Sequence, residues 1–561
     1  MGNTGMNRQE TKCHNIKTNC ILTILFSMLL MGWGLDSVAM SVPHAHIAEE
    51  NKGYVVLKKN ISLSQQLKRI NTIYEIKYDF DLNDPKGKKP IAIPKGCILK
   101  FEGGSIKNGT LNGNHTGIIA KDLMIFDAVT IKGTWNVPVI TSKWFKCVKD
   151  NDLVQAFNLL SDEIQNTLTI EKRTEDYWVG RQVGGTLANP SGILNLKSNT
   201  RCIVNGTIRQ RGHHSNYIHL FLLNKVENVV LEGSGTIYGE KKLHNYSGVT
   251  PILPTDEDYK KVTHENNHII TIQKCRNVTV SGLTLKDSTG DAIDILNLDE
   301  NVDNHIVIEN FTIDNCSRQG ISAEGSYIEI KNGTISNINR TMPMSGIDIE
   351  ISVSRNGRSA NDITVQNVVI TNCYTGFQSY TPATTPANIH DLKFRNVKCS
   401  NINRGFYIAE PIKNVSLVSC IFDIIPSLDT FTMNYSPSEN FSAENCRFIC
   451  DKEKCRETWG WPNIKSGDAG YSNKNTADYD FTMLRTGALY SEYNTKIKTR
   501  FKGCVVYSPY TNLIKRANKN TTIEDCVVTC HRLNVVTTSA AGIIKNSRID
   551  IKGANRKWKL K

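Results

Sequence analysis

Residues 277–295, 305–325 and 327–350 read NVTVSGLTLKDSTGDAIDI, HIVIENFTIDNCSRQGISAEG and YIEIKNGTISNINRTMPMSGIDIE. Related phrases follow at 362–380 (DITVQNVVITNCYTGFQSY) and 388–408 (NIHDLKFRNVKCSNINRGFYI). Each phrase alternates β-branched and polar residues over short stretches that Asn, Gly or Asp interrupt, which is typical of strands. One repeat cannot bury its own apolar face, whereas stacked repeats share a continuous core. The sequence therefore predicts an all-β solenoid, a parallel β-helix.

The repeat pattern also sets the expected domain organisation. Coil-like phrases appear before the strong repeats, as in CILKFEGGSIKNGTLNG from Cys97, and after them, as in the stretch from Asn414. The expected parts are a signal peptide at 1–39, an N-terminal β-rich coil region at 40–145, the main parallel β-helix at 146–449, an aromatic-rich insertion at 450–500, and final coils with a basic tail at 501–561.

One stretch departs from the strand pattern. Residues 152–165 place Leu153, Phe157, Leu160 and Ile164 on one face at helical spacing. The spacing predicts a helix near 152–165 that caps an open end of the solenoid, because uncovered edge strands invite aggregation.

The first residues have the features of a secretory signal. Arg8, Lys12 and Lys17 precede an apolar run at 21–33, and the small residues Ser37-Val38-Ala39 follow it. The run is too short to span a bilayer comfortably. We expect cleavage after residue 39 and a secreted or periplasmic protein without membrane contact; an uncleaved anchor is the alternative.

The overall charge favours polyanionic partners. The chain has 67 Lys and Arg against 54 Asp and Glu, a formal net charge of +13. A basic exported protein attracts acidic glycans through long-range electrostatics, although a mildly basic surface without a chosen partner is the alternative. The sequence contains no recognisable nucleic-acid module, and export argues against such a partner.

The cysteines give a second indication of compartment. Export usually implies disulfides, but several cysteines recur near the ends of equivalent strand phrases, which favours a buried column of free thiols. The column comprises Cys316, Cys373, Cys399, Cys420 and Cys446. Two cysteine groups have spacings that could bind a metal, namely Cys446, Cys450 and Cys455, and Cys526 and Cys530. No histidine cluster accompanies them, so we expect no metal.

The phrases GSGTIYG, GDAIDI, NCSRQGIS and SGIDIE resemble the pectin-lyase-like superfamily. That resemblance implies a right-handed parallel β-helix and the handling of a glycan, as in polygalacturonase-type hydrolases, polysaccharide lyases and tailspike depolymerases. Polygalacturonase-type hydrolases carry Asn-x-Asp, Asp-Asp, Gly-His-Gly and Arg-x-Lys motifs. Here GDAID replaces the paired aspartates, and neither of the last two motifs stands at a matching place.

Aligning the repeats on a small residue reveals a polar column. The small residues are Ala292, Gly320, Gly346, Gly376 and Gly405, and two positions later stand Asp294, Ser322, Asp348, Gln378 and Tyr407. Strand side chains alternate between faces, so Ile347 and Ile349 should face the core and Asp348 the solvent. We therefore expect an exposed track along one sheet. The resemblance implies that glycans bind there.

The column supplies candidate catalytic residues. Asp294 and Asp348 lie two coils apart, roughly 9 to 10 Å at the backbone, and inverting glycosidases use carboxyls about 6.5 to 9.5 Å apart. Asp291 is a third carboxylate, which could raise the proton affinity of a neighbour. Arg318, on the intervening coil, could bind a substrate carboxylate or sulfate. The alternative for each aspartate is a turn residue that bonds backbone amides.

Further side chains are candidates for sugar contacts. They are His264, Glu265, Gln378, Arg404, Tyr407, Trp459 and Trp461. His264 and Glu265 form a His-Glu phrase that resembles one in tailspike-like proteins. The two tryptophans could stack on sugar, or they could pack the insertion.

We therefore predict an exported glycoside hydrolase that cleaves a complex or acidic polysaccharide without a cofactor. A polysaccharide lyase is one alternative, with Ca²⁺ held near Asp287, Asp291 and Asp294. A non-catalytic glycan-binding or adhesion solenoid is the other. The sequence gives no prediction of the sugar, the linkage or the oligomeric state.

Overall fold

The computed structural model describes residues 52–180, 192–212, 217–243, 266–297, 304–341, 343–351, 359–380, 388–402, 404–408, 412–424, 431–433, 440–450, 488–492, 498–514, 520–534 and 542–551. Residues 51–561 form one compact unit. The expected signal peptide, most of the 450–500 insertion, and His264, Glu265, Trp459 and Trp461 lie outside the described residues.

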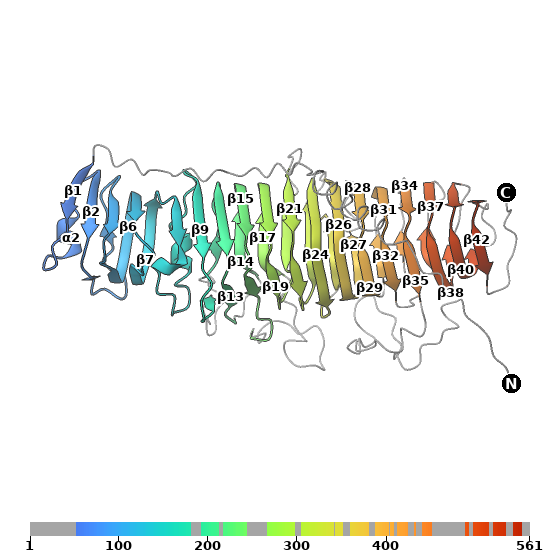
Figure 1. The fold of residues 1–561 in the computed structure, drawn as a ribbon, viewed down its shortest axis with the longest axis horizontal. Helices are drawn as coiled ribbons and strands as arrows, with labels where there is room; N and C mark the ends of the chain where they lie inside the picture. Colours follow the sequence, from blue (N-terminus) through green and yellow to red (C-terminus); the bar gives the residue numbers. More distant parts are fainter. Residues whose placement is uncertain are drawn as a thin grey trace, which may run out of the picture. The chain divides into compact units, whose positions relative to one another are not determined.

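The chain begins with short parallel coils. These contain β1 (Gly53–Val56), α2 (Leu63–Gln66), β2 (Thr72–Ile76), β3 (Phe80–Asp81), β4 (Ile91–Ala92), β5 (Ile98–Phe101), β6 (Ile106–Ile119) and β7 (Phe126–Trp135). Their strands pair in parallel, for example β2 with β5 and β6 with β7. Figure 1 shows them in blue, followed by the coils of the main repeat.

The main repeat forms three stacks of parallel strands, and each regular coil contributes to every stack. The first stack contains β8 (Val139–Thr141), β9 (Asn166–Ile170), β12 (Thr200–Val204), β15 (Glu227–Glu232), β18 (Arg276–Ser281), β21 (Ile306–Glu309), β24 (Ile328–Ile338), β26 (Ser359–Cys373), β28 (Asn388–Arg395), β31 (Ile412–Val418), β34 (Asn440–Glu444), β37 (Lys498–Lys502), β39 (Thr521–Glu524) and β41 (Ile543–Lys545). The later parts of β24 and β26 also belong to the second stack.

The other strands of the second stack are β10 (Tyr177–Val179), β13 (Thr207–Gln210), β16 (Thr236–Tyr238), β19 (Thr284–Lys286), β22 (Thr312–Asp314), β29 (Lys398–Ile402), β32 (Ile421–Ile424), β35 (Arg447–Cys450), β38 (Val505–Ile514), β40 (Val527–Asn534) and β42 (Arg548–Ile551). The third stack contains β11 (Leu194–Asn195), β14 (Tyr217–Asn224), β17 (Asn266–Gln273), β20 (Ile293–Asn297), β23 (Gln319–Gly325), β25 (Ser345–Glu350), β27 (Thr375–Tyr380), β30 (Arg404–Ile408), β33 (Phe431–Met433) and β36 (Ala488–Glu492). The predicted parallel β-helix is confirmed.

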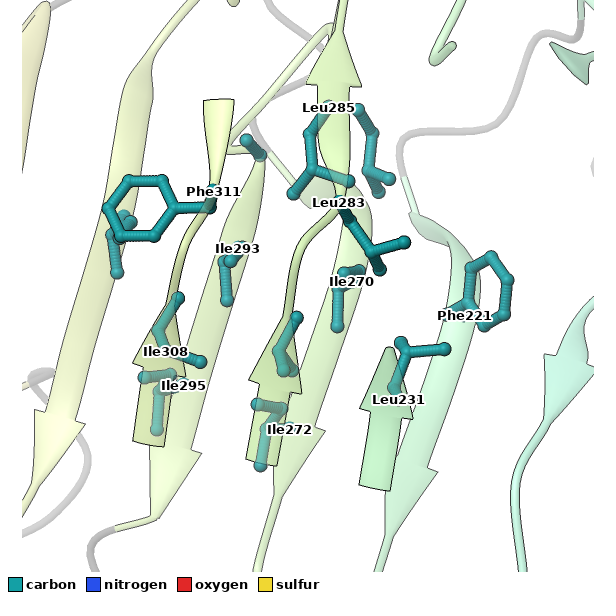
Figure 2. Close-up of a cluster of buried hydrophobic side chains, with 14 of the residues drawn as sticks. Phe221, Leu231, Ile270, Ile272, Leu283, Leu285, Ile293, Ile295, Ile308 and Phe311 are labelled. Atoms are coloured by element: carbon teal, nitrogen blue, oxygen red, sulfur yellow. The ribbon is translucent and has the colours of Figure 1, made fainter. Parts of the chain in front are cut away.

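The core is a continuous column of aliphatic and aromatic side chains between the stacks. Ile270, Ile293 and Ile321 lie in register on successive strands of the third stack, and all three are fully buried. Figure 2 shows how such residues from neighbouring coils pack together. Each buried side chain of this size contributes about 1.5–3 kcal/mol to folding, so stability accumulates coil by coil.

The asparagines between the strands of the repeats lie at the turns and stabilise them. Asn332, Asn367 and Asn396 have φ angles of 55°, 54° and 50°, which asparagine tolerates better than most residues. Their side-chain amides form a ladder: Asn367 Nδ2 donates to Asn332 Oδ1 at 3.0 Å, and Asn396 Nδ2 donates to Asn367 Oδ1 at 2.8 Å. The Asn-x-Thr phrase at Asn332 is therefore part of the turn ladder.

The predicted cysteine column is confirmed. Cys316, Cys373, Cys399, Cys420 and Cys446 are buried free thiols. Burial raises the pKa of Cys316 and of Cys373 to about 12, because the thiolate would lose its hydration. These sulfurs act as small apolar core groups.

The helix predicted over 152–165 is wrong in its extent. A helical turn, α3 (Val154–Phe157), is all that forms, and it packs between β7 and β11, within the stack of coils. Leu153, Phe157 and Leu160 are buried as the spacing requires. After Phe157, however, the amide of Leu160 bonds three residues back to Phe157, so the chain tightens and then enters β9. The 3₁₀ turn η1 (Ser142–Trp144) precedes it.

No helix in the described part of the chain is both long and apolar enough to cross a membrane.

Candidate active site

A polar column follows the outer face of the third stack. In register from β17 to β30 lie Thr271, Asp294, Ser322, Asp348, Gln378 and Tyr407. A second polar row lies three residues earlier in the chain and includes His268 on β17, Asp291 just before β20, and Gln319 at the start of β23. The alignment of repeats therefore predicted the neighbours of Asp294 and Asp348 correctly.

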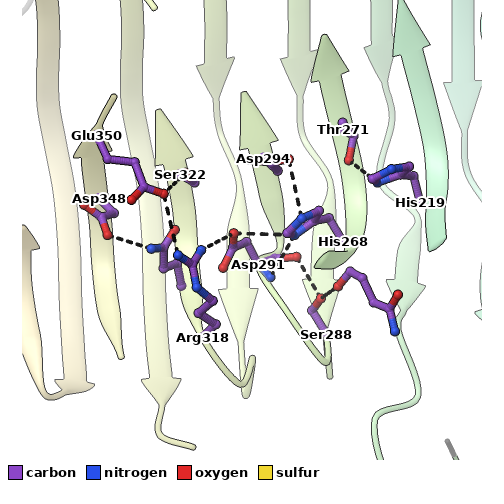
Figure 3. A network of polar contacts seen from close by, with 12 residues as sticks. His219, His268, Thr271, Ser288, Asp291, Asp294, Arg318, Ser322, Asp348 and Glu350 are labelled. Atoms are coloured by element: carbon purple, nitrogen blue, oxygen red, sulfur yellow. Dashed lines mark hydrogen bonds and ion pairs between the residues drawn. The ribbon is translucent and has the colours of Figure 1, made fainter. Parts of the chain in front are cut away.

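The expected exposure is wrong for Asp294, Ser322 and Asp348, whereas Gln378 and Tyr407 are partly exposed. Asp294 is 5% exposed, Ser322 1% and Asp348 0%. The alternation of strand side chains does direct them away from the isoleucine core. However, Gln319 and Gln378 bond to the carboxylate of Asp348, and the ring of His268 lies 3.5 Å from that of Asp294 (Figure 3). Strand periodicity fixes the face of a side chain, and the groups lying on that face decide its exposure.

His268, on β17, faces the carboxyl of Asp294. Its Nδ1 accepts a hydrogen bond from the backbone N–H of Asp291 at 3.1 Å, so the ring proton belongs on Nε2. Nε2 lies 3.5 Å from Asp294 Oδ2. Burial, with smaller effects of His219 and Arg318, lowers the pKa of His268 well below its usual value. The ring is therefore neutral and faces Asp294 with its N–H.

His219 extends this row onto β14. It pairs in register with His268, and the two rings stack with centroids 5.8 Å apart. Its Nδ1 lies 2.8 Å from the hydroxyl of Thr271. Burial lowers the pKa of His219.

Asp294 has the properties of a proton donor. Burial raises its pKa well above the usual value, and the negative charges of Asp291, Glu324 and Glu350 add to that effect. A carboxyl in such surroundings holds its proton to higher pH than an exposed aspartate does, as general acid catalysis requires.

Arg318 joins the carboxylates of two coils. Its Nη1 donates to Asp291 Oδ2 at 3.0 Å, and its Nη2 lies 3.6 Å from Glu350 Oε1. The Asp291 side chain is 1% exposed and that of Arg318 19%. The guanidinium therefore compensates a buried carboxylate while part of it still reaches solvent.

Asp348 is held by two amides. Gln319 Nε2 and Gln378 Nε2 donate to its Oδ2 at 2.6 and 3.1 Å. Burial raises the pKa of Asp348 well above its usual value, and the charge of Glu350 reinforces the shift. Gln378, predicted as a sugar contact, is thus part of the carboxylate cluster itself.

The far end of the column is aromatic and basic. The Arg404 guanidinium lies 4.7 Å from the ring centre of Tyr407 and 5.3 Å from that of Tyr374. Tyr407 follows Gln378 in register and is partly exposed. The structure therefore brings the predicted sugar contacts Arg404 and Tyr407 together, next to the carboxylates.

Among the described residues, one group of side chains in this cluster could hold a metal ion. Ligand atoms of His268, Asp291 and Asp294 lie within 4.8 Å of one another. The Nδ1 lone pair of His268 is already used by the amide of Asp291, and Nε2 carries the proton. Since a metal-bound imidazole needs a free lone pair toward the ion, this arrangement favours proton chemistry over metal binding.

Sequence reasoning missed four residues of the site, namely His219, His268, Glu324 and Glu350. Glu350 could have been predicted, because it stands two residues after Asp348 and therefore lies on the same face of the strand. His268 lies on a strand, NNHIITIQ, that carries no repeat phrase. Its position follows from pairing with β20, which the sequence alone does not reveal.

Comparisons with known proteins identify a family and several similar structures. The sequence profile of glycosyl hydrolases family 28 matches residues 177–480. The structure is similar to the family 28 exopolygalacturonase of Yersinia enterocolitica, with 11% identity, a TM-score of 0.42, and coverage of 75% of this chain and 80% of that one. It is also similar to the A-module of the mannuronan C-5 epimerase AlgE6 of Azotobacter vinelandii, with 11% identity, a TM-score of 0.44, and coverage of 75% and 100%.

The tailspike protein of E. coli bacteriophage HK620, solved in complex with a pentasaccharide, is a third similar structure. It has 14% identity, a TM-score of 0.42, and coverage of 72% of this chain and 63% of that one. No curated protein matches the sequence.

Proposed function

Because the chain belongs to glycosyl hydrolases family 28, among the right-handed parallel β-helix proteins of the pectin-lyase-like superfamily, we propose that it hydrolyses a glycosidic bond of a complex or acidic polysaccharide at Asp294. The observation that carries this proposal is the environment of Asp294. Its pKa is raised, a neutral imidazole holds it, and further carboxylates lie on the neighbouring coils.

In this proposal Asp294 is the general acid. It gives its proton to the glycosidic oxygen as the bond from that oxygen to the anomeric carbon breaks. His268 fixes the carboxyl with its Nε2–H. Asp291, compensated by Arg318, supplies nearby negative charge that keeps the proton on Asp294.

The base belongs to β25, two coils away. It removes a proton from the water whose oxygen attacks the anomeric carbon. Asp348 is the residue that the sequence predicts for this role, since a spacing of two strands, roughly 9 to 10 Å at the backbone, suits a carboxyl pair with water between them.

Sugar binding would extend along the column. The exposed part of Arg318 suits a carboxylate or sulfate of the substrate, and Tyr407 with Arg404 would supply a stacking face and a second cation. Gln378, which donates to Asp348 at 3.1 Å, would also contact the sugar. The proposed sugar contacts also include His264, Glu265, Trp459 and Trp461. The signal-like N-terminal segment supports the proposal that the protein is exported.

Product analysis tests the proposal. The protein without residues 1–39 is incubated with a panel of plant, host and algal glycans, and the products are separated. Saturated reducing ends that the Asp294→Asn variant does not release would support hydrolysis. An unsaturated sugar absorbing in the ultraviolet would identify a lyase, and binding without products would identify an adhesion or binding solenoid.

A further inference from the structure

The β25 strand offers two carboxylates, and they differ in access. Asp348 is fully buried, and its Oδ2 already accepts two amide hydrogen bonds. The Glu350 side chain is 16% exposed, more than those of Asp291 and Asp294, which are 1% and 7% exposed. A base must reach the water or hydroxyl that it deprotonates, so access favours Glu350.

Glu350 is also directed toward Asp294. Its Oε1 accepts a hydrogen bond from the hydroxyl of Ser322 at 3.3 Å. Ser322 lies on the intervening strand β23, directly beside Asp294 in register. The Glu350 carboxylate therefore leans back across β23, as Figure 3 shows, and leaves between one and two strand spacings, roughly 5 to 10 Å, to Asp294.

Arg318 gives the carboxyl of Glu350 different surroundings from that of Asp294. Its Nη2 faces Glu350 Oε1 at 3.6 Å, whereas Asp294 is faced by the neutral His268. The Glu350 carboxyl thus faces a cation, and the Asp294 carboxyl faces an uncharged N–H donor. An acid–base pair needs two carboxyls in different electrostatic surroundings.

We propose that Glu350 is the catalytic base of the hydrolysis assigned to Asp294, and that Asp348 is a positioning residue that orients Gln319 and Gln378. This inference rests on the proposed function. Glu350 takes a proton from water, the water oxygen bonds to the anomeric carbon, and the leaving oxygen receives the proton of Asp294. One water is consumed, and both carboxyls exchange protons with solvent afterwards.

The test uses a glycan that the wild-type protein cleaves. Glu350→Gln should lower kcat by at least about a hundredfold and leave the melting temperature unchanged. The matched control is Glu329→Gln, which removes a surface glutamate paired with Lys331 at 2.5 Å, and it should retain wild-type turnover. Asp348→Asn should lower turnover less than Glu350→Gln does.

Rescue separates a base from a structural residue. Azide attacks without losing a proton, so sodium azide should restore cleavage by Glu350→Ala and yield a glycosyl azide, but it should not rescue Asp294→Ala. Wild-type turnover in Glu350→Gln, or a loss that azide does not restore, would overturn the assignment. If only Asp294→Asn is inactive, the assignment of Glu350 fails while the proposed function stands; if both variants are active, both proposals fail.

Discussion

Replacing Arg318 by Met tests whether the carboxylate cluster is as charge-dependent as the structure indicates. The substitution keeps much of the side-chain volume but removes the cation that donates to Asp291 at 3.0 Å. Removing one partner of a buried pair costs about 3–5 kcal/mol. Since Arg318 is 19% exposed and water can enter in its place, we expect a loss at or below the lower end of that range, about 2–3 kcal/mol.

The loss should be local, because coils of a solenoid open semi-independently. Hydrogen exchange of amides in β20 and β23 measures it directly. The double variant Arg318→Met/Asp291→Asn should recover most of the stability, since the fully buried carboxylate is gone and only the partly exposed Glu350 loses its cation. The matched control is Arg276→Met, which breaks a surface pair with Glu227 whose side chains are 58% and 47% exposed; it should cost less than about 1 kcal/mol.

Equal losses in Arg318→Met and Arg276→Met would refute the reasoning. So would a double variant that is no more stable than Arg318→Met alone, because the cost would then lie in packing rather than in an unpaired carboxylate.

Two further predictions concern proton affinity and the turns. Because the pKa of Asp294 is raised and the acid must be protonated, kcat/KM should fall as pH rises through that pKa. The His268→Gln substitution alters the donor that faces Asp294, so the alkaline limb of its pH profile should shift. An unshifted limb would argue against the contact. Asn367→Ala removes both ladder hydrogen bonds and places alanine at a φ of 54°, so it should cost about 1–3 kcal/mol in urea unfolding. Asn367→Gly removes the same bonds without the backbone strain and should cost less; equal costs would show that φ is unimportant there.

The sequence was sufficient to predict the coils and their register. The small residues that aligned the repeats have a steric reason: a Cβ at Gly320 would lie 2.6 Å from Ile335 Cγ2, and one at Gly346 would lie 2.6 Å from Ile370 Cγ2. These two coils therefore need a small residue where an isoleucine side chain approaches the strand. Counting two residues onward then placed Asp294 beside Ser322 and Ser322 beside Asp348.

Burial and partners could not be predicted in the same way. Whether Asp348 meets water depends on Gln319 and Gln378, which come from other coils and bond to it through side chains. The contact between His268 and Asp294 depends on a strand outside the repeat pattern. Apolar spacing at Leu153 and Phe157 indicated burial correctly, but it could not distinguish a long helix from one turn followed by a strand.

Turnover of Asp294→Asn tests the central claim most directly. Asparagine keeps the shape of the side chain and its acceptor for the Nε2–H of His268, and it introduces no buried charge, so the fold should persist with an unchanged melting temperature. We predict that kcat falls at least about a hundredfold on a glycan that the wild-type protein hydrolyses. Near-wild-type turnover in this variant would contradict the assignment of Asp294 as the general acid.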